Sequence, residues 1–257
     1  MFFTVSNDDG YQAEGFRCLV EAILRRGHDV LAVAPHTQCS AKSQSLTLDR
    51  PIMLHEIEIR EHLRLYSVEG TPADASRLAL VLAERKADFC MAGVNRGENV
   101  SAGVLYSGTV AAAREGAMAG LPSIAVSLAA GGTHEGLLRI ADFAVRLAEM
   151  NRTANYPRFG VLNVNAPALP PERWKEPVFA PVSASYFRDR YTERESPFGQ
   201  RYFWLGTAQG TKDELHMDPH APGTDAALLS EGHVTLTMLG GVECAAPDGI
   251  SLPGGAV

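Results

Sequence analysis

The sequence predicts an α/β fold with three layers, in which helices cover both faces of a mostly parallel β-sheet. Two observations support this prediction. Short apolar runs typical of buried strands alternate with stretches of helical periodicity over the first two-thirds of the chain. The composition, with 46% hydrophobic and 21% charged residues among 257, indicates a globular chain long enough to bury a core without disulfides or a structural metal.

The first βαβ unit sets the direction of the sheet. Residues 2–6 are apolar and rich in β-forming side chains, and residues 16–24 repeat apolar side chains at helical spacing. Gly27 follows as a C-cap, and residues 30–34 form the next strand, which Pro35 ends. Strands joined through a helix run parallel with a right-handed crossover, so we expect these two strands to be parallel.

The same alternation of strands and helices continues to residue 164. Thr71 is expected to cap a helix that has Pro72 at its first position. The further elements expected from periodicity are strands at 52–59, 63–68, 89–94, 124–128 and 159–164 and helices at 72–85, 108–120 and 137–150. This order supplies helices for both faces of the sheet.

From Pro167 onward the character of the chain changes, because prolines become frequent and helical periodicity disappears. Residues 191–205 are polar and aromatic around a turn at 197–199, which predicts a β-hairpin arm. A late strand is expected at 234–239. We therefore divide the chain into an α/β catalytic core at 1–167, a β-rich extension with the hairpin arm at 168–240, and a loose tail at 241–257.

The charge balance restricts the partners that the chain can bind. Asp and Glu outnumber Lys and Arg by 30 to 23, so no overall positive charge attracts a nucleic-acid duplex. No apolar run reaches the roughly 20 residues that cross a bilayer, and the chain starts directly on a strand without a secretion signal. We therefore expect a cytoplasmic protein that binds neither nucleic-acid duplexes nor membranes.

Two adjacent carboxylates follow the first strand. Asn7, Asp8, Asp9 and Gly10 come directly after it, and ligands of open parallel sheets bind beyond the carboxyl ends of the strands. Two carboxylates held close together repel each other, and a divalent cation such as Mg²⁺ relieves that repulsion. An ordinary turn explains the same residues equally well, since Asn, Asp and Gly are common in turns.

Hydroxyl and amide side chains follow two further strands. Ser40, Ser43 and Ser45 lie in the loop after the second parallel strand, where a hydroxyl can bind Mg²⁺ or a phosphate oxygen. Asn95 and Asn99 follow a buried strand near the middle of the chain. Asn95 supplies a neutral oxygen ligand, and Asn99 can orient a water or a substrate oxygen. Polar loops of this kind are also common without any ligand.

A fourth polar segment opens the alanine-rich helix. Ser107, Gly108 and Thr109 stand at its start, where the free N–H groups and the positive end of the helix dipole suit a phosphate. A plain N-cap by Ser107 or Thr109 explains the segment equally well. No G-x-x-x-x-G-K-[ST] motif is present, so the chain is not a Walker-type nucleotide hydrolase. We expect all four segments to lie on one side of the sheet.

Over nearly its whole length the chain resembles the SurE family of metal-dependent nucleotidases and phosphatases. The order and spacing of many blocks make the resemblance specific. The matching blocks are SNDDGY at 6–11, VAP at 33–35, SLTL at 45–48, GTPAD at 70–74, GVNRGEN at 93–99, YSGTV at 106–110, LNVNAP at 162–167, WLG at 204–206, GTD at 223–225 and the strand at 234–239.

This resemblance implies a fold, a cofactor, a reaction and an assembly. The fold is a doubly wound α/β domain, and the cofactor is one divalent ion, Mg²⁺ or Mn²⁺, held by Asp8, Asp9, Ser40 and Asn95. The reaction is the hydrolysis of phosphate monoesters, typically nucleoside 5′- or 3′-monophosphates, to a nucleoside and phosphate. The assembly is a homodimer or homotetramer in which the C-terminal arm is exchanged between subunits.

The expected catalytic residues are Asp8, Asp9 and Asn99, with one of the carboxylates accepting a proton from the attacking water. The residues expected to bind the phosphoryl oxygens are Asn99, Ser107, Gly108 and Thr109, together with Ser43 and Ser45. A rival hypothesis makes Asp8 or Asp9 a nucleophile that forms an aspartyl-phosphate, although phosphatases of that type use Asp-x-Asp. Candidate proton donors are His36, His216, His220 and His233, although a histidine in a solvated loop or strand is more often without a catalytic role.

Two departures from the family pattern keep a different function open. Ala41 stands where the family has Gly, and if the loop needs a positive φ there, Ala41 strains it by about 1 kcal/mol or more. Residues 100–103 also replace the Gly and acidic residues that usually follow the second Asn. The alternative is a metal-dependent nucleotide-binding or regulatory protein with little turnover, or an enzyme whose natural ester is not a nucleotide.

Overall fold

A computed structural model describes residues 1–185, 187–188, 191–205, 216–217 and 220–240. Its central sheet has nine strands in the order β3-β4-β2-β1-β5-β6-β7-β13-β8. The strands from β4 to β7 run parallel, whereas β3 is antiparallel to β4 and β13 is antiparallel to β7. The nine strands are β1 (Phe2–Ser6), β2 (Asp29–Pro35), β3 (Leu54–Arg60), β4 (Leu63–Val68), β5 (Phe89–Arg96), β6 (Ser123–Leu128), β7 (Val161–Ala166), β8 (Lys175–Phe179) and β13 (His233–Leu239).

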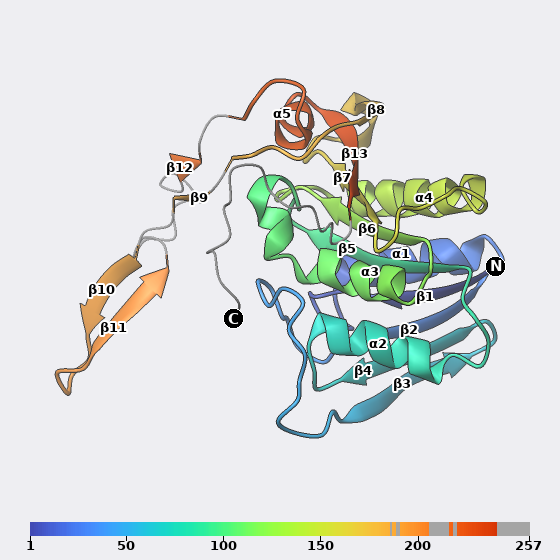
Figure 1. Cartoon of the computed structure of the whole chain (residues 1–257), viewed down its shortest axis with the longest axis horizontal. Helices are drawn as coiled ribbons and strands as arrows, with labels where there is room; N and C mark the ends of the chain where they lie inside the picture. Colours follow the sequence, from blue (N-terminus) through green and yellow to red (C-terminus); the bar gives the residue numbers. More distant parts are fainter. Residues whose placement is uncertain (186, 189–190, 206–215, 218–219, 241–257) are drawn as a thin grey trace, which may run out of the picture.

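Helices cover both faces of this sheet and make three layers (Figure 1). α1 (Glu14–Arg25) and α4 (His134–Met150) pack together on one face, where their apolar side chains join the main hydrophobic core. α2 (Pro72–Leu82) and α3 (Gly108–Met118) pack together on the other face. Shorter helices are η1 (Ser101–Leu105), η2 (Pro171–Arg173) and α5 (Asp225–Ser230). The predicted α/β fold with a mostly parallel sheet is therefore confirmed.

The first βαβ unit forms for the reasons that its sequence gives. β1 is buried along its whole length and pairs in parallel with β2, with Phe3 opposite Val30. Gly27 follows the last turn of α1 with φ 74°, a conformation in which a side chain would be strained. Its N–H donates to the carbonyl of Leu24, which closes the helix.

The ends of several elements differ from the ranges that periodicity predicts. α2 ends at Leu82 instead of 85, and α4 begins at His134 because Thr133 caps it, its Oγ1 accepting from the N–H of Gly136 at 3.1 Å. β8 and α5 are not predicted by the sequence pattern. β8 contains Pro177, has mostly exposed residues and pairs within the sheet only with β13, so its strand conformation depends on a distant segment.

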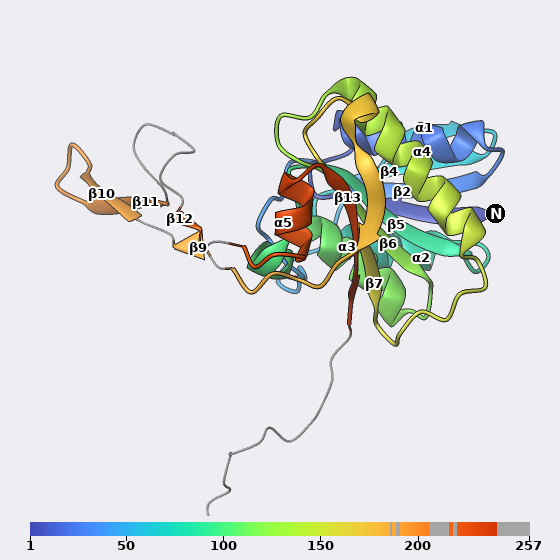
Figure 2. The ribbon, with the colours of Figure 1, turned by 90° about the horizontal axis from the view of Figure 1, so that it is seen from above.

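The predicted hairpin arm is present. β10 (Tyr191–Glu195) and β11 (Arg201–Leu205) pair antiparallel and project away from the three layers (Figures 1 and 2). Two short strands, β9 (Phe187–Arg188) and β12 (His216–Met217), pair at the base of the arm. The expected tail at 241–257 lies outside the described residues, and the division of the chain into three segments stays a prediction. Among the described residues, no helix is long and apolar enough to cross a membrane.

The start of α2 ties together two loops through one buried carboxylate. Asp74 accepts from the N–H of Thr71 at 2.9 Å, while Thr71 Oγ1 accepts from the N–H of Asp74 at 3.1 Å, which is a capping box. Asp74 also accepts from Thr47 Oγ1 at 2.6 Å and from its N–H at 3.2 Å. Burial raises the pKa of Asp74, but these hydrogen bonds outweigh it and hold the pKa below its usual value.

We expect Asp74→Ala to lower the free energy of unfolding at pH 7 by about 2–3 kcal/mol, since several donors lose a charged acceptor. Because folding lowers the pKa of Asp74, its contribution is complete above about pH 4 and disappears as the pH falls through the folded pKa. Urea denaturation of the wild type and variant at pH 7 and pH 3 measures this. Asp49→Ala, at an exposed carboxylate, is the control. A destabilisation of equal size at both pH values would contradict the assignment.

Candidate active site

Four segments that are distant in the sequence meet at the carboxyl end of β1. The turn that follows β1 carries Asp8 and Asp9. The carbonyl of Asp8 accepts from the N–H of Cys39 at 2.7 Å, and Asp9 Oδ2 accepts from the N–H of Arg96 at 3.2 Å. Asp8 Oδ1 accepts a short hydrogen bond from Thr109 Oγ1. The loop after β2, the end of β5 and the start of α3 therefore all contact this turn, as the sequence predicts.

The carboxylate of Asp8 is buried beside a second carboxylate. Asp8 is only 4% exposed, and burial raises its pKa to about 6. The hydrogen bond from Thr109 opposes this rise in pKa, and the neighbouring negative charge of Asp9 adds to it. Two adjacent carboxylates with so little water around one of them are stable as anions only when a positive charge compensates them.

Gly108 gives Asp8 room at the start of α3. A Cβ at Gly108 would lie 2.7 Å from Asp8 Cβ, 2.9 Å from Asp8 Oδ2 and 2.9 Å from Pro72 Cγ. Ser107 caps the helix, because its Oγ accepts from the N–H of Val110 at 3.1 Å. The first turn of α3 thus lies directly against the carboxylate, with its positive dipole end facing it.

The oxygens gathered here match the chemistry of a hard divalent cation. Asn95 donates from Nδ2 to the carbonyl of Gly97 at 2.8 Å, so its Oδ1 is the side-chain atom left for a ligand. Ser40 is exposed in the loop after β2. Asn7 Oδ1 is buried without a hydrogen-bond partner in the same turn as the two carboxylates. Carboxylate, amide and hydroxyl oxygens are ligands of Mg²⁺ and Mn²⁺, and no group of three His, Cys, Asp or Glu side chains among the described residues offers a competing site.

Two of the hydroxyls predicted to bind phosphate donate hydrogen bonds to backbone carbonyls. Ser43 Oγ donates to the carbonyl of Leu105 at 2.8 Å, and Ser45 Oγ donates to the carbonyl of Lys42 at 2.8 Å. Ala41 has φ 59°, which is the left-handed conformation that the family glycine suggests, and Ser43 has φ 53°. The loop therefore holds two non-glycine residues in a conformation that side chains disfavour.

Asn99 is nearly buried, and most of its polar groups are engaged within the protein. Its Nδ2 donates to Ser127 Oγ at 3.0 Å, and its N–H donates to Asn165 Oδ1 at 2.8 Å. Its carbonyl accepts from Nδ2 of Asn163 at 2.7 Å and of Asn165 at 3.1 Å. These contacts fix the course of the chain between β5 and η1, and a direct contact of Asn99 with phosphate stays a prediction.

The described hydrogen-bond contacts of His36, His220 and His233 are with groups other than the two carboxylates. His36 Nδ1 lies 3.1 Å from Ser67 Oγ, His220 Nδ1 lies 2.9 Å from Ser185 Oγ, and His233 Nδ1 lies 2.9 Å from a backbone carbonyl. His216 lies in β12 at the base of the arm.

Two anchoring carboxylates near the site are not predicted by the sequence. Glu115 is buried in α3, where its carboxylate accepts from Gln44 Nε2 at 2.6 Å and so attaches the loop after β2 to the helix. Glu14 of α1 pairs with the guanidinium of Arg96, and the backbone N–H of Arg96 donates to Asp9. The only sequence feature that indicates a role for Glu115 is its position as the single acidic residue of an Ala-rich helix. No local sequence feature predicts the Glu14–Arg96 ion pair.

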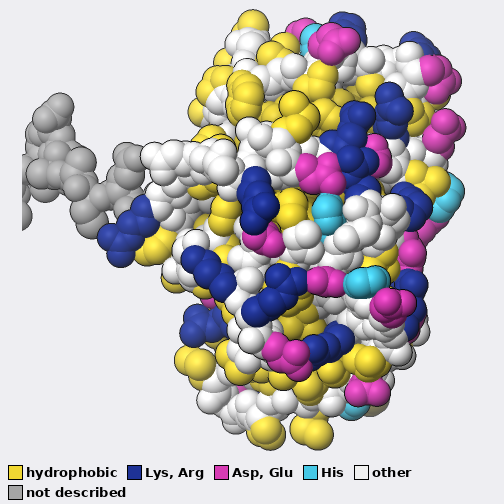
Figure 3. Space-filling view, turned by 90° about the vertical axis from the view of Figure 1, so that its right-hand side faces the viewer, with side chains coloured by type: hydrophobic (Ala, Val, Ile, Leu, Met, Phe, Trp, Pro, Cys, Tyr) yellow, Lys and Arg dark blue, Asp and Glu magenta, His cyan; other side chains and the backbone are white. Residues whose placement is uncertain are grey.

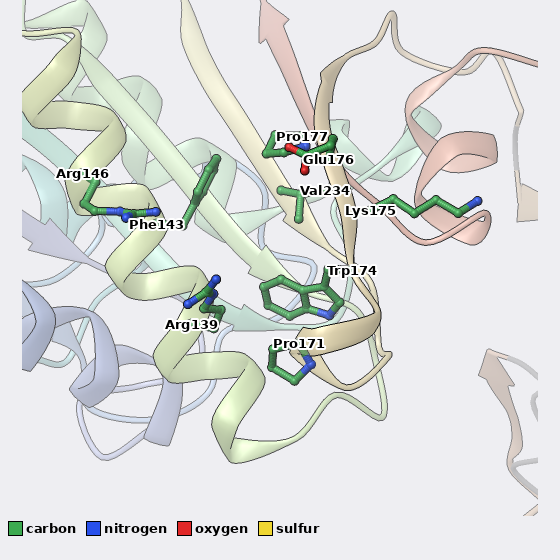
Figure 4. Close-up of a pocket in the computed structure, with 9 residues that line it drawn as sticks. All are labelled: Arg139, Phe143, Arg146, Pro171, Trp174, Lys175, Glu176, Pro177 and Val234. Atoms are coloured by element: carbon green, nitrogen blue, oxygen red, sulfur yellow. The ribbon is translucent and has the colours of Figure 1, made fainter.

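One cavity lies far from the two carboxylates. Its volume is about 330 Å³, and it opens between α4 and β8, where Phe143, Trp174 and Val234 form its apolar side and the side chain of Lys175 points away (Figure 4). Four strands separate β8 from β1 in the sheet. On the face opposite the arm, positive and negative side chains are interspersed (Figure 3).

Comparison with known proteins identifies relatives over most of the chain. Residues 3–189 match the family model described as Survival protein SurE. The proteins called 5′-nucleotidase SurE from Thermosynechococcus vestitus and Desulfovibrio desulfuricans are 37% and 38% identical to the chain over 93% and 91% of it, and over 90% and 91% of their own lengths. The crystal structure of the SurE protein from Aquifex aeolicus superimposes with a TM-score of 0.74 at 30% identity, covering 93% of both chains.

We expect Gly108→Ala to weaken Mn²⁺ binding about 10- to 100-fold, because its Cβ would displace the carboxylate of Asp8. Isothermal titration calorimetry with Mn²⁺ measures the affinity, and circular dichroism checks the fold. Gly240→Ala is the matched control, since a Cβ there meets no atom within 4 Å. Unchanged Mn²⁺ affinity in a folded Gly108→Ala variant would show that Asp8 does not take part in metal binding.

Proposed function

The chain belongs to the SurE family, and from this premise we propose that it is a 5′-nucleotidase, which hydrolyses nucleoside 5′-monophosphates to a nucleoside and phosphate. Nucleotidases of this family are metal-dependent. The observation that carries the proposal is the carboxylate pair of Asp8 and Asp9, one of them buried, at the junction of β1, β5 and the start of α3. Hydrolysis of nucleoside 3′-monophosphates by the same site is part of the proposal.

Asp8, Asp9, Ser40 and Asn95 would hold one Mg²⁺ or Mn²⁺ ion. Such an ion would supply Lewis acidity toward the phosphate oxygens. The chain itself would position the reacting groups. Thr109 holds Oδ1 of Asp8, which leaves Oδ2 of Asp8 for the cation. Asp9 accepts from the N–H of Arg96 through Oδ2 and from Gln38 Nε2 through Oδ1 at 3.3 Å, and these bonds fix its carboxylate beside Asp8.

The phosphate would lie at the N-terminus of α3, where Ser107, Gly108 and Thr109 begin the helix. The helix dipole favours a negative group there. One of the two carboxylates would accept the proton of the attacking water. Asn99, Ser43 and Ser45 would contribute chiefly by fixing the loops that surround the phosphate, as their backbone contacts indicate.

The arm supports an oligomeric assembly of this nucleotidase. A two-stranded hairpin alone is only marginally stable in water. In addition, β10 and β11 expose large apolar side chains, which is typical of a surface that another protein segment covers. Phe198 is 91% exposed, Trp204 is 64% exposed and Phe203 is 53% exposed. Exchange of the arm between the subunits of a dimer or tetramer would cover these side chains. The cytoplasmic location expected from the sequence stays a prediction.

We expect Asp9→Ala to reduce phosphate release from adenosine 5′-monophosphate by about 100-fold or more at saturating Mn²⁺ or Mg²⁺, because the cation loses a charged ligand. EDTA should abolish the activity of the wild type. Asp49→Ala, which removes an exposed carboxylate in the loop before β3, should retain wild-type activity.

Full activity of Asp9→Ala would refute the metal assignment. If calorimetry shows that the nucleotide binds, and phosphate is released neither from the nucleotide nor from p-nitrophenyl phosphate, the result would instead favour the binding-protein alternative. Recovery of a phosphorylated protein after acid quenching would favour the aspartyl-phosphate alternative. Release from p-nitrophenyl phosphate alone would indicate a phosphatase for another ester.

We expect a variant carrying both Phe203→Asp and Trp204→Asp to have the mass of a monomer in light scattering, whereas the wild type has the mass of a dimer or tetramer. The two charges would oppose burial of β11 in a neighbouring subunit. Arg194→Ala, on the facing strand, is the control. A monomeric wild type, or an unchanged mass of the variant, would contradict arm exchange.

A further inference from the structure

A mostly apolar cavity opens on the same edge of the sheet as the two carboxylates. Its volume is about 370 Å³, which lies in the range of small-molecule pockets. Three segments line it: the loop after β5, the ends of β6 and β7, and the segment around α5. The lining residues include Glu98, Val100, Ala129, Ala168, Ala226 and Leu229.

The cavity adjoins the proposed catalytic residues through one short loop. Asn95, a proposed ligand of the cation, and Glu98, which lines the cavity, are three residues apart, so their Cα atoms lie within about 11 Å of each other. The loop is fixed on the end of β6, because the N–H of Gly97 donates to the carbonyl of Leu128 at 2.8 Å. The N–H of Ala130 donates to Glu98 Oε2 at 3.0 Å. The loop that carries Asn95 therefore also forms one wall of the cavity.

The walls of the cavity suit a flat, largely apolar group. Val100, Ala226 and Leu229 are buried together and form a small hydrophobic cluster with Ala129. Their surfaces can cover the faces of a nucleobase, since bases are planar and bind between apolar side chains. An alkyl phosphate or inorganic phosphate has no planar group that could fill this cavity.

One carboxylate at the rim matches the hydroxyls of a ribose. Glu98 Oε2 accepts from Ala130, whereas Oε1 has no hydrogen-bond partner among residues 1–185 and the other described stretches. A carboxylate accepts hydrogen bonds from ribose hydroxyls in dinucleotide-binding folds, and the same chemistry applies here. Its negative charge repels phosphate, so it also favours the orientation in which the phosphate points toward the cation and α3.

A buried aspartate gives the cavity a fixed shape before any ligand binds. Asp225, which is fully buried, accepts from the N–H of Ser183 at 2.8 Å and from the N–H of Ser101 at 3.1 Å. It thereby joins α5 to η1, the short helix that leads to Ser107 at the phosphate end. Both ends of the proposed ligand are thus held in a constant relative position, which lowers the entropic cost of binding.

We propose that this cavity is the nucleoside subsite of the enzyme and that Glu98 determines a preference for ribonucleotides over 2′-deoxyribonucleotides. The inference rests on the proposed nucleotidase function. Glu98 accepts a hydrogen bond from the ribose, and the cluster around Leu229 covers the base. The 2′-deoxy substrate cannot make the hydrogen bond from the 2′-hydroxyl.

The experiment measures kcat/KM for adenosine 5′-monophosphate, its 2′-deoxy counterpart and p-nitrophenyl phosphate. We expect the kcat/KM of the wild type to be about tenfold higher for the ribonucleotide than for the 2′-deoxy substrate, as one hydrogen bond to a charged group predicts. In Glu98→Ala the two kcat/KM values should be about equal. Ala168→Trp, which fills the mouth of the cavity from an exposed position, should lower the ratio of nucleotide to p-nitrophenyl phosphate activity about tenfold. Ala119→Trp, an exposed alanine at the end of α3, is the control and should leave both ratios unchanged.

An unchanged ribose preference in Glu98→Ala, together with an unchanged activity ratio in Ala168→Trp, would overturn the subsite. The proposed function is tested separately by p-nitrophenyl phosphate, which does not need the cavity. If no substrate is hydrolysed, the nucleotidase proposal fails, and calorimetry with adenosine still decides the inference. About tenfold weaker adenosine binding by Glu98→Ala and Ala168→Trp would support it, and equal affinities would refute it.

Discussion

The arrangement of the site follows from one electrostatic constraint, the burial of Asp8 next to Asp9 in the turn after β1. A carboxylate that is 4% exposed beside another carboxylate requires compensation by hydrogen bonds, by a cation or by both. Thr109 provides one hydrogen bond, and Gly108 leaves the space in which the start of α3 approaches. The side-chain oxygens of Asn7 and Asn95 lie in the same turn and at the neighbouring strand end, where a cation would compensate the two carboxylates.

Three buried carboxylates at some distance from this point hold the surrounding loops. Asp74 binds the loop at Thr47, Glu115 binds it at Gln44, and Asp225 binds the start of η1. Each accepts from donors on a segment far away in the sequence, so each joins a loop to a helix that packs on the sheet. The loops that carry Ser40 and Ser107 are therefore held on the helices by buried hydrogen bonds, although their sequences are typical of ordinary polar loops.

Much of this molecule was predictable from its sequence, for reasons that are local. Buried strands and the caps at Thr71 and Gly27 follow from apolar periodicity and backbone preferences, and the position of the site follows from the end of β1 in a parallel sheet. The sequence raised a positive φ at Ala41 only as a condition under which the loop is strained, and the structure meets that condition. In contrast, β8, the Glu14–Arg96 pair and the backbone contacts of Ser43 depend on partners far along the chain, which no local pattern contains.

The place of β13 in the sheet has a consequence for the order in which the protein is built. This strand is the last one described in the chain, yet it lies between β7 and β8 and is the only strand of the sheet that pairs with β8. During synthesis, β8 leaves the ribosome first and has no partner until residues 233–239 have followed. The segment between them, which includes the arm, is thus translated while this edge of the sheet is still open, and the edge closes only when the last described strand is in place.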